Sequence, residues 1–362
     1  MLRRWKVRAN EYSLHMPKRN LPFSILPGFD ETAMILPSEM KAQKRFGMEE
    51  KMDIIQVEDL TKKYGDFTAV DHVSFAVERG TMLAFLGVNG AGKTTVINML
   101  ATLLSPDGGR AEVCGEILGK GDQKIRRNIG IVYQQNCLDD ILTVRENLMC
   151  RGIIHGASKA EAKEQCNRLG RILKLDDIMK KKYRMLSGGQ KRKCEIAAAL
   201  MHTPEILFLD EPTTGLDPAT RVDVWSTIEA LQKVEKMTVF LTTHYMEEAA
   251  GAEQIIIMDH GNIIAQGTPF ELKEKFASDK LKLYCKEGKE EQVLEFGDSL
   301  CFRDNVRGEM KLMEDRVIEV QIPSTMSSVP MIHQVKDLID GFEVIQGSMD
   351  DMFLNAVGKE LV

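Results

Sequence analysis

The sequence predicts an α/β fold, and three observations lead to that prediction. Short runs of β-branched and apolar residues alternate with helical stretches from residue 53 onward. Two of these runs, TMLAFLG (81–87) and EILFLD (205–210), are almost continuously apolar. Such runs are typical of strands in a sheet that is covered on both faces. A glycine-rich turn, GVNGAGKTT (87–95), then links the first run to a predicted helix.

The composition is that of an ordinary globular protein, with 43% hydrophobic and 28% charged residues in 362. A formal net charge of −6 argues against broad electrostatic binding to nucleic acid. Seven cysteines without a C-x-x-C pair indicate neither a disulfide framework nor a zinc site, so a reduced cytosolic setting is expected. No apolar run approaches the roughly 18 residues of a membrane span, and any membrane role is expected to need a partner chain.

Residues 1–51 are predicted to form a poorly ordered extension, because they contain four prolines and no sustained periodicity. Their basic start resembles a signal peptide, but Pro22, Pro27 and Asp30 interrupt the apolar segment that should follow, so secretion is not indicated. Met48 and Met52 suggest the hypothesis that this leader is a translation-start artefact or a dispensable tail.

A nucleotide-binding domain is expected over residues 52–276 and a small accessory domain over residues 277–362. In the first, the predicted strands are 54–60, 68–80, 81–87, 129–133, 205–210, 238–243 and 254–259, and the predicted helices begin at Gly92 or span 143–153 and 159–173. In the second, strands are predicted at 281–285, 306–314, 317–322 and 342–347, and helices at 289–300, 327–340 and 350–358. This βαββαβ order predicts an α+β, ferredoxin-like domain.

The turn at residues 87–95 satisfies the phosphate-loop pattern G-x-x-x-x-G-K-[ST] and stands between a predicted strand and a predicted helix, as that motif requires. Its glycines allow the backbone to wrap around phosphate groups. Lys93 is expected to neutralise β- and γ-phosphate oxygens, and Thr94 to ligate Mg²⁺. A glycine turn without a ligand is the alternative, and the flanking strand and helix disfavour it.

The apolar strand at 205–210 delivers Asp210 and Glu211 to the carboxyl end of the sheet, where ligands of open α/β sheets bind. Asp210 is expected to hold the metal's water shell. Glu211, one residue on and therefore on the other face of the pleat, is expected to act as general base on an attacking water. Taken alone, the pair also fits two solvated carboxylates before a proline turn.

The motif LSGGQ (186–190) narrows the class, because with the two motifs above it resembles the nucleotide-binding domain of the ABC ATPases over about residues 54–272. Tyr64 stands where that family stacks an aromatic ring on adenine. Gln134 matches the Q-loop glutamine; the neighbouring Gln135 is the alternative, and the offset from Ile129 and Gly130 favours Gln134. GLDP (215–218) matches the D-loop, and His244 matches the switch histidine that reads the γ-phosphate.

The resemblance implies a P-loop ATPase core with a helical signature subdomain that binds ATP and Mg²⁺. By the same resemblance, Glu211 and His244 are catalytic, and Thr94, Gln134 and Asp210 lie at the metal. The residues implied for nucleotide binding are Tyr64, Gly87, Val88, Asn89, Gly90, Ala91, Gly92, Lys93, Thr94, Thr95, Gln134, Ser187, Gly188, Gly189, Gln190 and Asp217. In the family the signature of one domain and the phosphate loop of another enclose each ATP. A second ATPase subunit is therefore implied, expected as a homodimer with a heterodimer left open.

The sequences around the motifs, such as LTVRENL (142–148) and SMDDMFLNAVG (348–358), resemble those of ATPase subunits of drug, lipid and polysaccharide exporters, including the daunorubicin-resistance type. That likeness implies a separate integral membrane permease, docked near the Q-loop and residues 143–173, and a location at the cytoplasmic face of the membrane. ATP-driven export of an unspecified substance is the function it implies.

Two other functions stay open. A soluble ABC-type ATPase acting on ribosomes or DNA is disfavoured. Such proteins normally carry two ATPase domains in one chain or large insertions within the ATPase core, whereas the core from Gly87 to His244 here is single and runs without a large insertion. A nucleotide-binding protein without hydrolysis is disfavoured by the presence of Glu211 and His244. The basic run from Lys191 to Lys193 is expected to be a solvated helix face, not a nucleic-acid site.

Overall fold

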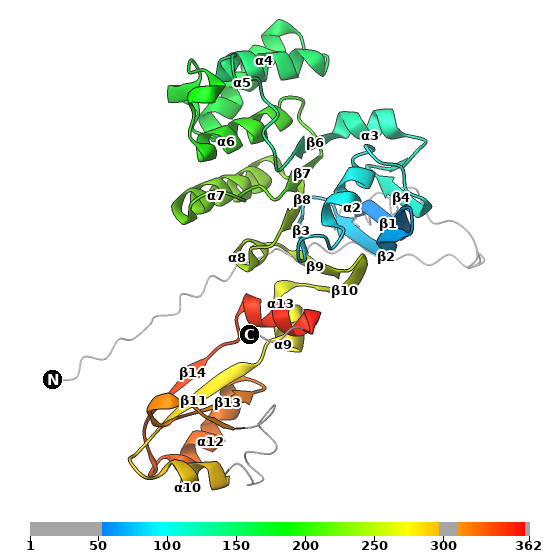
Figure 1. Ribbon diagram of the computed structural model, residues 1–362. Helices are drawn as coiled ribbons and strands as arrows, with labels where there is room; N and C mark the ends of the chain where they lie inside the picture. The colour runs from blue at the N-terminus through cyan, green and yellow to red at the C-terminus, as the bar shows by residue number, and fades with distance from the viewer. Residues whose placement is uncertain (1–52, 297–309, 359–362) are drawn as a thin grey trace, which may run out of the picture. The chain divides into compact units, whose positions relative to one another are not determined.

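The computed structural model describes residues 53–296 and 310–358 (Figure 1), so the extension predicted at residues 1–51 lies outside the described residues. The strands up to residue 267 are β1 (Asp53–Tyr64), β2 (Phe67–Glu78), β3 (Met82–Leu86), β4 (Gly108–Val113), β5 (Glu116–Ile117), β6 (Ile129–Val132), β7 (Ile206–Asp210), β8 (Thr238–Thr243), β9 (Gln254–Asp259) and β10 (Asn262–Gly267). The α-helices described up to residue 276 are α2 (Lys93–Leu100), α3 (Asp122–Asn128), α4 (Val144–Ile154), α5 (Lys159–Ile172), α6 (Gly188–Ala199), α7 (Pro218–Glu235), α8 (Met246–Ala249) and α9 (Pro269–Phe276).

These strands form two sheets. The larger has the order β10-β9-β3-β8-β7-β6, in which β9, β3, β8, β7 and β6 are parallel and β10 pairs with β9 in the antiparallel sense. The smaller, β2-β1-β4-β5, is antiparallel. Since β3 and β7 both end at the carboxyl edge of the parallel sheet, the loops that follow them meet there.

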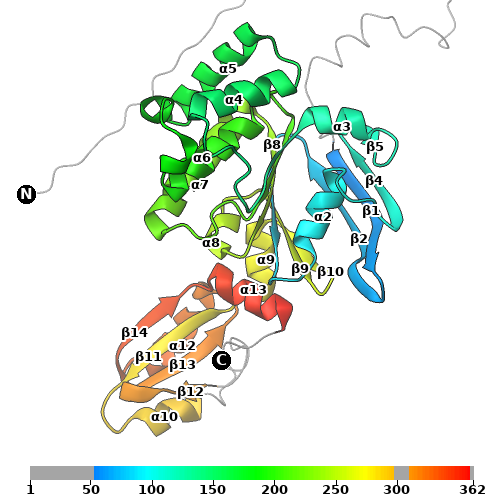
Figure 2. The same cartoon turned by 45° about the horizontal axis from the view of Figure 1, so that its top comes forward.

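The continuous apolar sequence of β3 is explained by two cores, one on each face of the larger sheet. Leu83 and Phe85 belong to the core that the antiparallel sheet and α2 complete. Met82, Ala84 and Leu86 belong to the core on the side of α4 to α7 (Figure 2). All five side chains are at most 2% exposed. Burial of each large apolar side chain stabilises the fold by about 1.5–3 kcal/mol, so β3 anchors the phosphate loop firmly.

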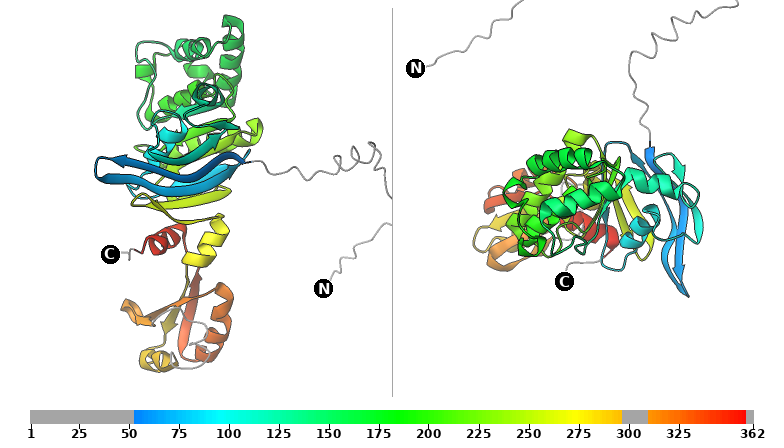
Figure 3. Two further views of the ribbon diagram at one scale, coloured as in Figure 1. Left: turned by 90° about the vertical axis from the view of Figure 1, so that its right-hand side faces the viewer. Right: turned by 90° about the horizontal axis from the view of Figure 1, so that it is seen from above.

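A helical segment follows β6. Figure 3 shows α4, α5 and α6 (green) gathered apart from the blue strands β1 and β2. Both α4 and α5 begin with a capping box, formed by Thr143 with Glu146 and by Ser158 with Glu161. The helices approach closely at Gly152, where an added Cβ would lie 3.0 Å from the Cβ of Ala162.

The remaining strands and α-helices are β11 (Asp279–Cys285), α10 (Glu290–Glu295), β12 (Lys311–Leu312), β13 (Val317–Ile322), α12 (Ser328–Val335), β14 (Ile339–Ile345) and α13 (Met349–Val357). Their antiparallel sheet has the order β12-β13-β11-β14 and a separate core. The last helix, α13, instead contributes Met352 and Phe353 to the core that contains Leu272 of α9. Asn355 Nδ2 also donates to the carbonyl of Phe276 at 2.8 Å. Within the described part of the chain, no helix combines the length and apolar character that crossing a bilayer requires.

Candidate functional site: a phosphate loop beside two carboxylates

The loop from Gly87 to Gly92 links β3 to α2, and close packing of its backbone explains two of its glycines. An added Cβ on Gly87 would lie 2.4 Å from the carbonyl oxygen of Met258, and one on Gly92 would lie 2.4 Å from that of Ala69. Gly92, with φ of 105°, also precedes the first residue of α2 in a conformation that L side chains rarely adopt. The loop is therefore held against neighbouring backbone, with the free N–H groups of a helix start beside it.

Lys93 is buried, with 5% of its surface exposed. Its Nζ donates to the carbonyl oxygens of Gly87 at 2.8 Å and Val88 at 3.1 Å, and it lies 4.0 Å from Glu211 Oε1. Burial lowers the pKa of Lys93, and the carboxylates of Glu211 and Asp210 partly oppose that shift. A cation held this way inside a glycine loop suits an incoming polyanion.

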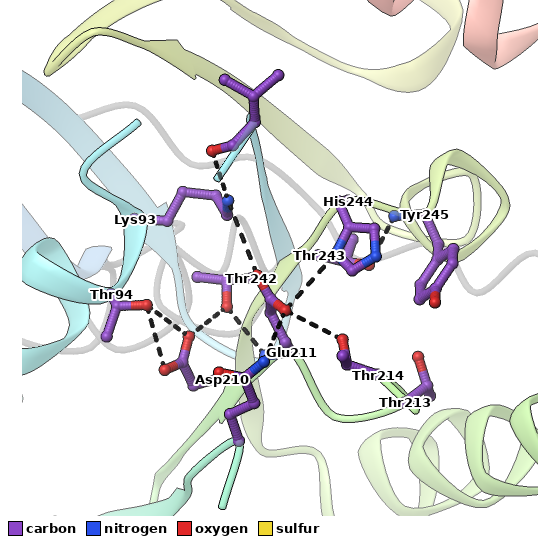
Figure 4. A network of polar contacts seen from close by, with 12 residues as sticks. Lys93, Thr94, Asp210, Glu211, Thr213, Thr214, Thr242, Thr243, His244 and Tyr245 are labelled. Carbon is purple, nitrogen blue, oxygen red and sulfur yellow. Dashed lines mark hydrogen bonds and ion pairs between the residues drawn. The ribbon is translucent and has the colours of Figure 1, made fainter. Parts of the chain in front are cut away.

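Asp210 ends β7 and meets the start of α2. Its carboxylate accepts hydrogen bonds from Thr94 Oγ1 at 3.1 and 3.3 Å and from Thr242 Oγ1 at 2.7 Å (Figure 4). A hydroxyl and a carboxylate placed together are hard oxygen donors of the kind that Mg²⁺ prefers. The donor set formed by Thr94 and Asp210 therefore fits that ion.

Glu211 lies between Lys93 and His244, as Figure 4 shows. Its Oε2 accepts from Thr214 Oγ1 at 3.0 Å and from Gln134 Nε2 at 3.3 Å, and lies 3.6 Å from His244 Nδ1. Its backbone has φ of 45°, a left-handed conformation. The sequence predicts Glu211 on the opposite face of the strand from Asp210. The left-handed turn at Glu211 instead brings both carboxylates to the phosphate loop.

A cleft of about 390 Å³ opens beside the loop. Its lining residues are Tyr64, Phe67, Ala69, Asn89, Gly90, Gly92, Lys93, Thr94, Thr95, Gln134 and Glu211. Tyr64 is 51% exposed and pairs with Phe67 across the turn between β1 and β2. An exposed aromatic pair at the mouth of a polar cleft can stack on a planar heterocycle.

The signature residues Ser187, Gly188, Gly189 and Gln190 and the D-loop residue Asp217 do not line this cleft. Ser187 caps α6, where its Oγ accepts from the N–H of Gln190 and its own N–H donates to Gln190 Oε1. Asp217 caps α7 by accepting from the N–H of Thr220 at 3.0 Å. The structure thus brings together the predicted residues from the phosphate loop, Gln134, Asp210, Glu211 and His244, and leaves the signature at another helix start of the same chain.

The prediction for the basic run in α6 is wrong for two of its three members. Arg192 is 4% exposed and Lys193 is 8% exposed. Lys193 Nζ lies 2.6 Å from Asp223 Oδ2, and the Arg192 guanidinium donates to backbone carbonyls. These charges are buried because α6 packs against neighbouring loops as well as the core, which a short helical pattern does not reveal.

Three residues of the site were missed in the sequence. Phe67 lines the cleft, Thr242 donates to Asp210, and Thr214 donates to Glu211. Thr214 follows β7, and Thr242 lies at the end of β8. Because the carboxyl ends of parallel strands meet at one edge of a sheet, the predicted order of these strands could have indicated both threonines. Phe67 lies just past the turn in KKYGDF, where an exposed aromatic has no core role.

A phosphate loop after one parallel strand and two carboxylates after its near neighbour define a P-loop NTPase site. The family model described as ABC transporter matches residues 70–214. The chain is 42% identical over 234 residues to the daunorubicin resistance ATP-binding protein DrrA3 of Streptomyces coeruleorubidus, covering 64% of this chain and 74% of that protein. It is 34% identical over 312 residues to the linearmycin resistance ATP-binding protein LnrL of Bacillus subtilis, covering 85% and 99%.

Solved structures show the same fold. The cbiO1 protein of Clostridium perfringens, part of an ABC transporter complex, superposes with a TM-score of 0.57 at 27% identity, covering 68% of this chain and 96% of that one. A dimeric ATP-binding cassette bound to ADP and Pi gives a TM-score of 0.54 at 27% identity, covering 59% and 98%. The chain therefore belongs to the ATP-binding proteins of the ABC transporter family, and it is an ATPase of that class.

Proposed function

We propose that this protein is the ATP-hydrolysing subunit of an ABC exporter, which dimerises on ATP and drives a separate membrane permease. The observation that carries the proposal is the position of Glu211, in contact with Gln134 and His244 and 4.0 Å from Lys93. A carboxylate with these neighbours lies beside the place where the γ-phosphate of ATP would meet Lys93. The resistance and export proteins to which the chain is similar support the exporter branch.

In this proposal Lys93 and the loop N–H groups hold the β- and γ-phosphates, and Tyr64 stacks on the adenine. Thr94 and Asp210 would hold Mg²⁺, which when bound polarises the phosphate oxygens. Glu211 accepts a proton from the attacking water, and His244 and Gln134 keep the Glu211 carboxylate and that water aligned.

The signature explains why a second copy is needed. Ser187 and the N–H groups of Gly188 and Gly189 stand at the positive end of α6, outside the cleft that Lys93 lines. We infer that they bind the γ-phosphate of a nucleotide held by another subunit. Loss of that phosphate on hydrolysis removes the contact and opens the dimer.

The permease is proposed to dock where the Q-loop meets α4 and α6. A hollow of about 240 Å³ lies there, with Tyr133, Cys137, Arg151 and His155 in its lining. The location proposed for the protein is the cytoplasmic face of the membrane, through this partner. Purification of the natural complex from membranes would identify the permease, and recovery of the ATPase without any multispanning chain would oppose this part of the proposal.

Residues 277–362 are proposed to form an accessory domain of ferredoxin-like type. The order β12-β13-β11-β14, with α10 and α12 between strands, supports that type. Because α13 packs on α9 and shares the ATPase core, we infer that the domain is tied to the ATPase at its C-terminal end as well as at β11.

The proposal is tested by replacing the carboxylate with its amide. We expect Glu211→Gln to lower the steady-state ATPase rate by about 10²- to 10⁴-fold, because the amide cannot accept the proton. ATP binding should persist, since Lys93 and the loop are unchanged. An undiminished ATPase rate would remove Glu211 from the general-base role. Glu205→Gln, in an exposed ion pair with Arg79, is a matched control that should leave the rate unchanged.

A further inference from the structure

Helix α6 carries a buried basic residue and a buried acidic residue one turn apart. Arg192 is 4% exposed and Glu195 is 7% exposed. Residues three apart on a helix lie on the same face, and here that face meets the Q-loop. Buried charges need partners, and both side chains find theirs mainly in the backbone of other segments.

Arg192 binds three carbonyl oxygens from two segments. One terminal nitrogen donates to Tyr133 at 2.6 Å. The other donates to Gln134 at 3.4 Å and to Glu211 at 3.1 Å. A planar guanidinium offers several donors in fixed directions, which a lysine ammonium cannot reproduce.

Glu195 binds the other end of the same loop. Its Oε1 accepts from the N–H groups of Cys137 at 2.8 Å and Leu138 at 3.1 Å, and from the Tyr183 hydroxyl at 2.7 Å. The Q-loop from 133 to 138 is therefore fixed at its entry by Arg192 and at its exit by Glu195, both on α6.

The geometry points to Arg192 as a positioning residue for hydrolysis, one that sets the backbone of Gln134 and Glu211 from the signature helix of the same chain. The Glu211 backbone is left-handed, a conformation that surrounding contacts have to hold. Arg192 supplies one such contact by donating to the Glu211 carbonyl oxygen. The Glu211 N–H donates to the Thr242 carbonyl oxygen at 3.1 Å.

The N-terminal end of α6 carries Ser187, proposed above for the nucleotide of the other subunit, and the next turn carries Arg192, which holds the hydrolytic groups of its own subunit. Because Arg192 binds the carbonyl oxygens of Gln134 and Glu211, it would carry any movement of α6 to the backbone of both residues. This inference rests on the general-base role proposed for Glu211.

The test compares Arg192→Lys with wild type and with Arg168→Lys in the full-length protein. Arg168 makes a partly buried pair with Glu235 away from the site, so Arg168→Lys is the same chemical change in a control position. We expect Arg192→Lys to lower kcat by about 10- to 100-fold, because catalytic groups are displaced. We expect KM for ATP to change by less than about threefold, because Lys93, the loop and Tyr64 are untouched.

A wild-type kcat in Arg192→Lys, or a fall in kcat matched by the same fall in Arg168→Lys, would overturn the inference. If Arg192→Lys does not fold, Arg192→Gln is measured in its place, since its amide can still donate to a carbonyl oxygen of the loop and carries no buried charge of its own. Glu211→Gln is measured in parallel. Wild-type turnover in Glu211→Gln would refute the general-base role of Glu211. Loss of turnover in Glu211→Gln together with a wild-type kcat in Arg192→Lys would refute the positioning role of Arg192 alone.

Discussion

Asp210 and Glu211 are adjacent in the chain but differ in their surroundings. Asp210 is bound by the hydroxyls of Thr94 and Thr242, whereas Glu211 contacts Gln134 and His244. Two carboxylates can take different roles when their environments differ. The sequence predicted both residues and their shared location, because the apolar strand and the following acidic pair are local features. It did not predict the left-handed backbone at Glu211, which depends on contacts from α6 and β8.

His202 provides a prediction on pH. Burial, with His155 stacked at 4.0 Å, lowers the pKa of His202 to about 4. The unfolded chain, with a histidine pKa of about 6.5, binds the extra proton first, so stability falls as pH decreases from 6.5 towards 4. The amide of His202→Gln can still donate to the Ile129 carbonyl. Between pH 7 and pH 5 we expect the free energy of unfolding of this variant to fall by about 1 kcal/mol less than that of wild type, after allowance for solvent screening.

Urea unfolding at the two pH values measures this difference. Equal losses of stability in wild type and His202→Gln would mean that His202 is not held neutral by the fold.

At the scale of elements, α6 joins most of the site. Ser187 caps its N-terminus, and its turns carry Arg192 and Glu195. Gly189 also lies against α7, since an added Cβ would be 2.2 Å from Thr220 Cγ2. The sequence predicted this helix from the run that contains Lys191 to Lys193. Its burial could not be predicted, because the surfaces that cover it come from the Q-loop and α7, distant in sequence.

The shared-site proposal predicts the effect of a bulky residue at the start of α6. We expect Ser187→Phe in the Glu211→Gln background to bind ATP as a monomer but to lose ATP-dependent dimerisation, because the side chain fills the place proposed for the partner's γ-phosphate. Gel filtration with ATP measures this. Ser158→Phe removes the same type of capping box from α5 and should dimerise normally. A normal dimer with Ser187→Phe would refute the shared-site account.

At the scale of the whole molecule, the alternation of apolar runs and helices predicted the α/β core, because each central strand feeds two cores. The antiparallel strand β4 and the long helix α7 were not predicted. The first is short and contains Gly108 and Gly109, and the second is masked by its mixed apolar and charged sequence. Neither segment therefore shows the hydrophobic periodicity from which a strand or a helix is predicted. The return of α13 to the ATPase core also lay beyond prediction, since it joins segments about 80 residues apart.

The central claim is that ATP joins two copies of this chain through a nucleotide that each copy only half encloses. Light scattering on Glu211→Gln with and without ATP and Mg²⁺ tests it most directly. The account predicts the mass of one chain without nucleotide, twice that mass with ATP, and one chain again with ADP. A single-chain mass at ATP concentrations that saturate binding would contradict the account.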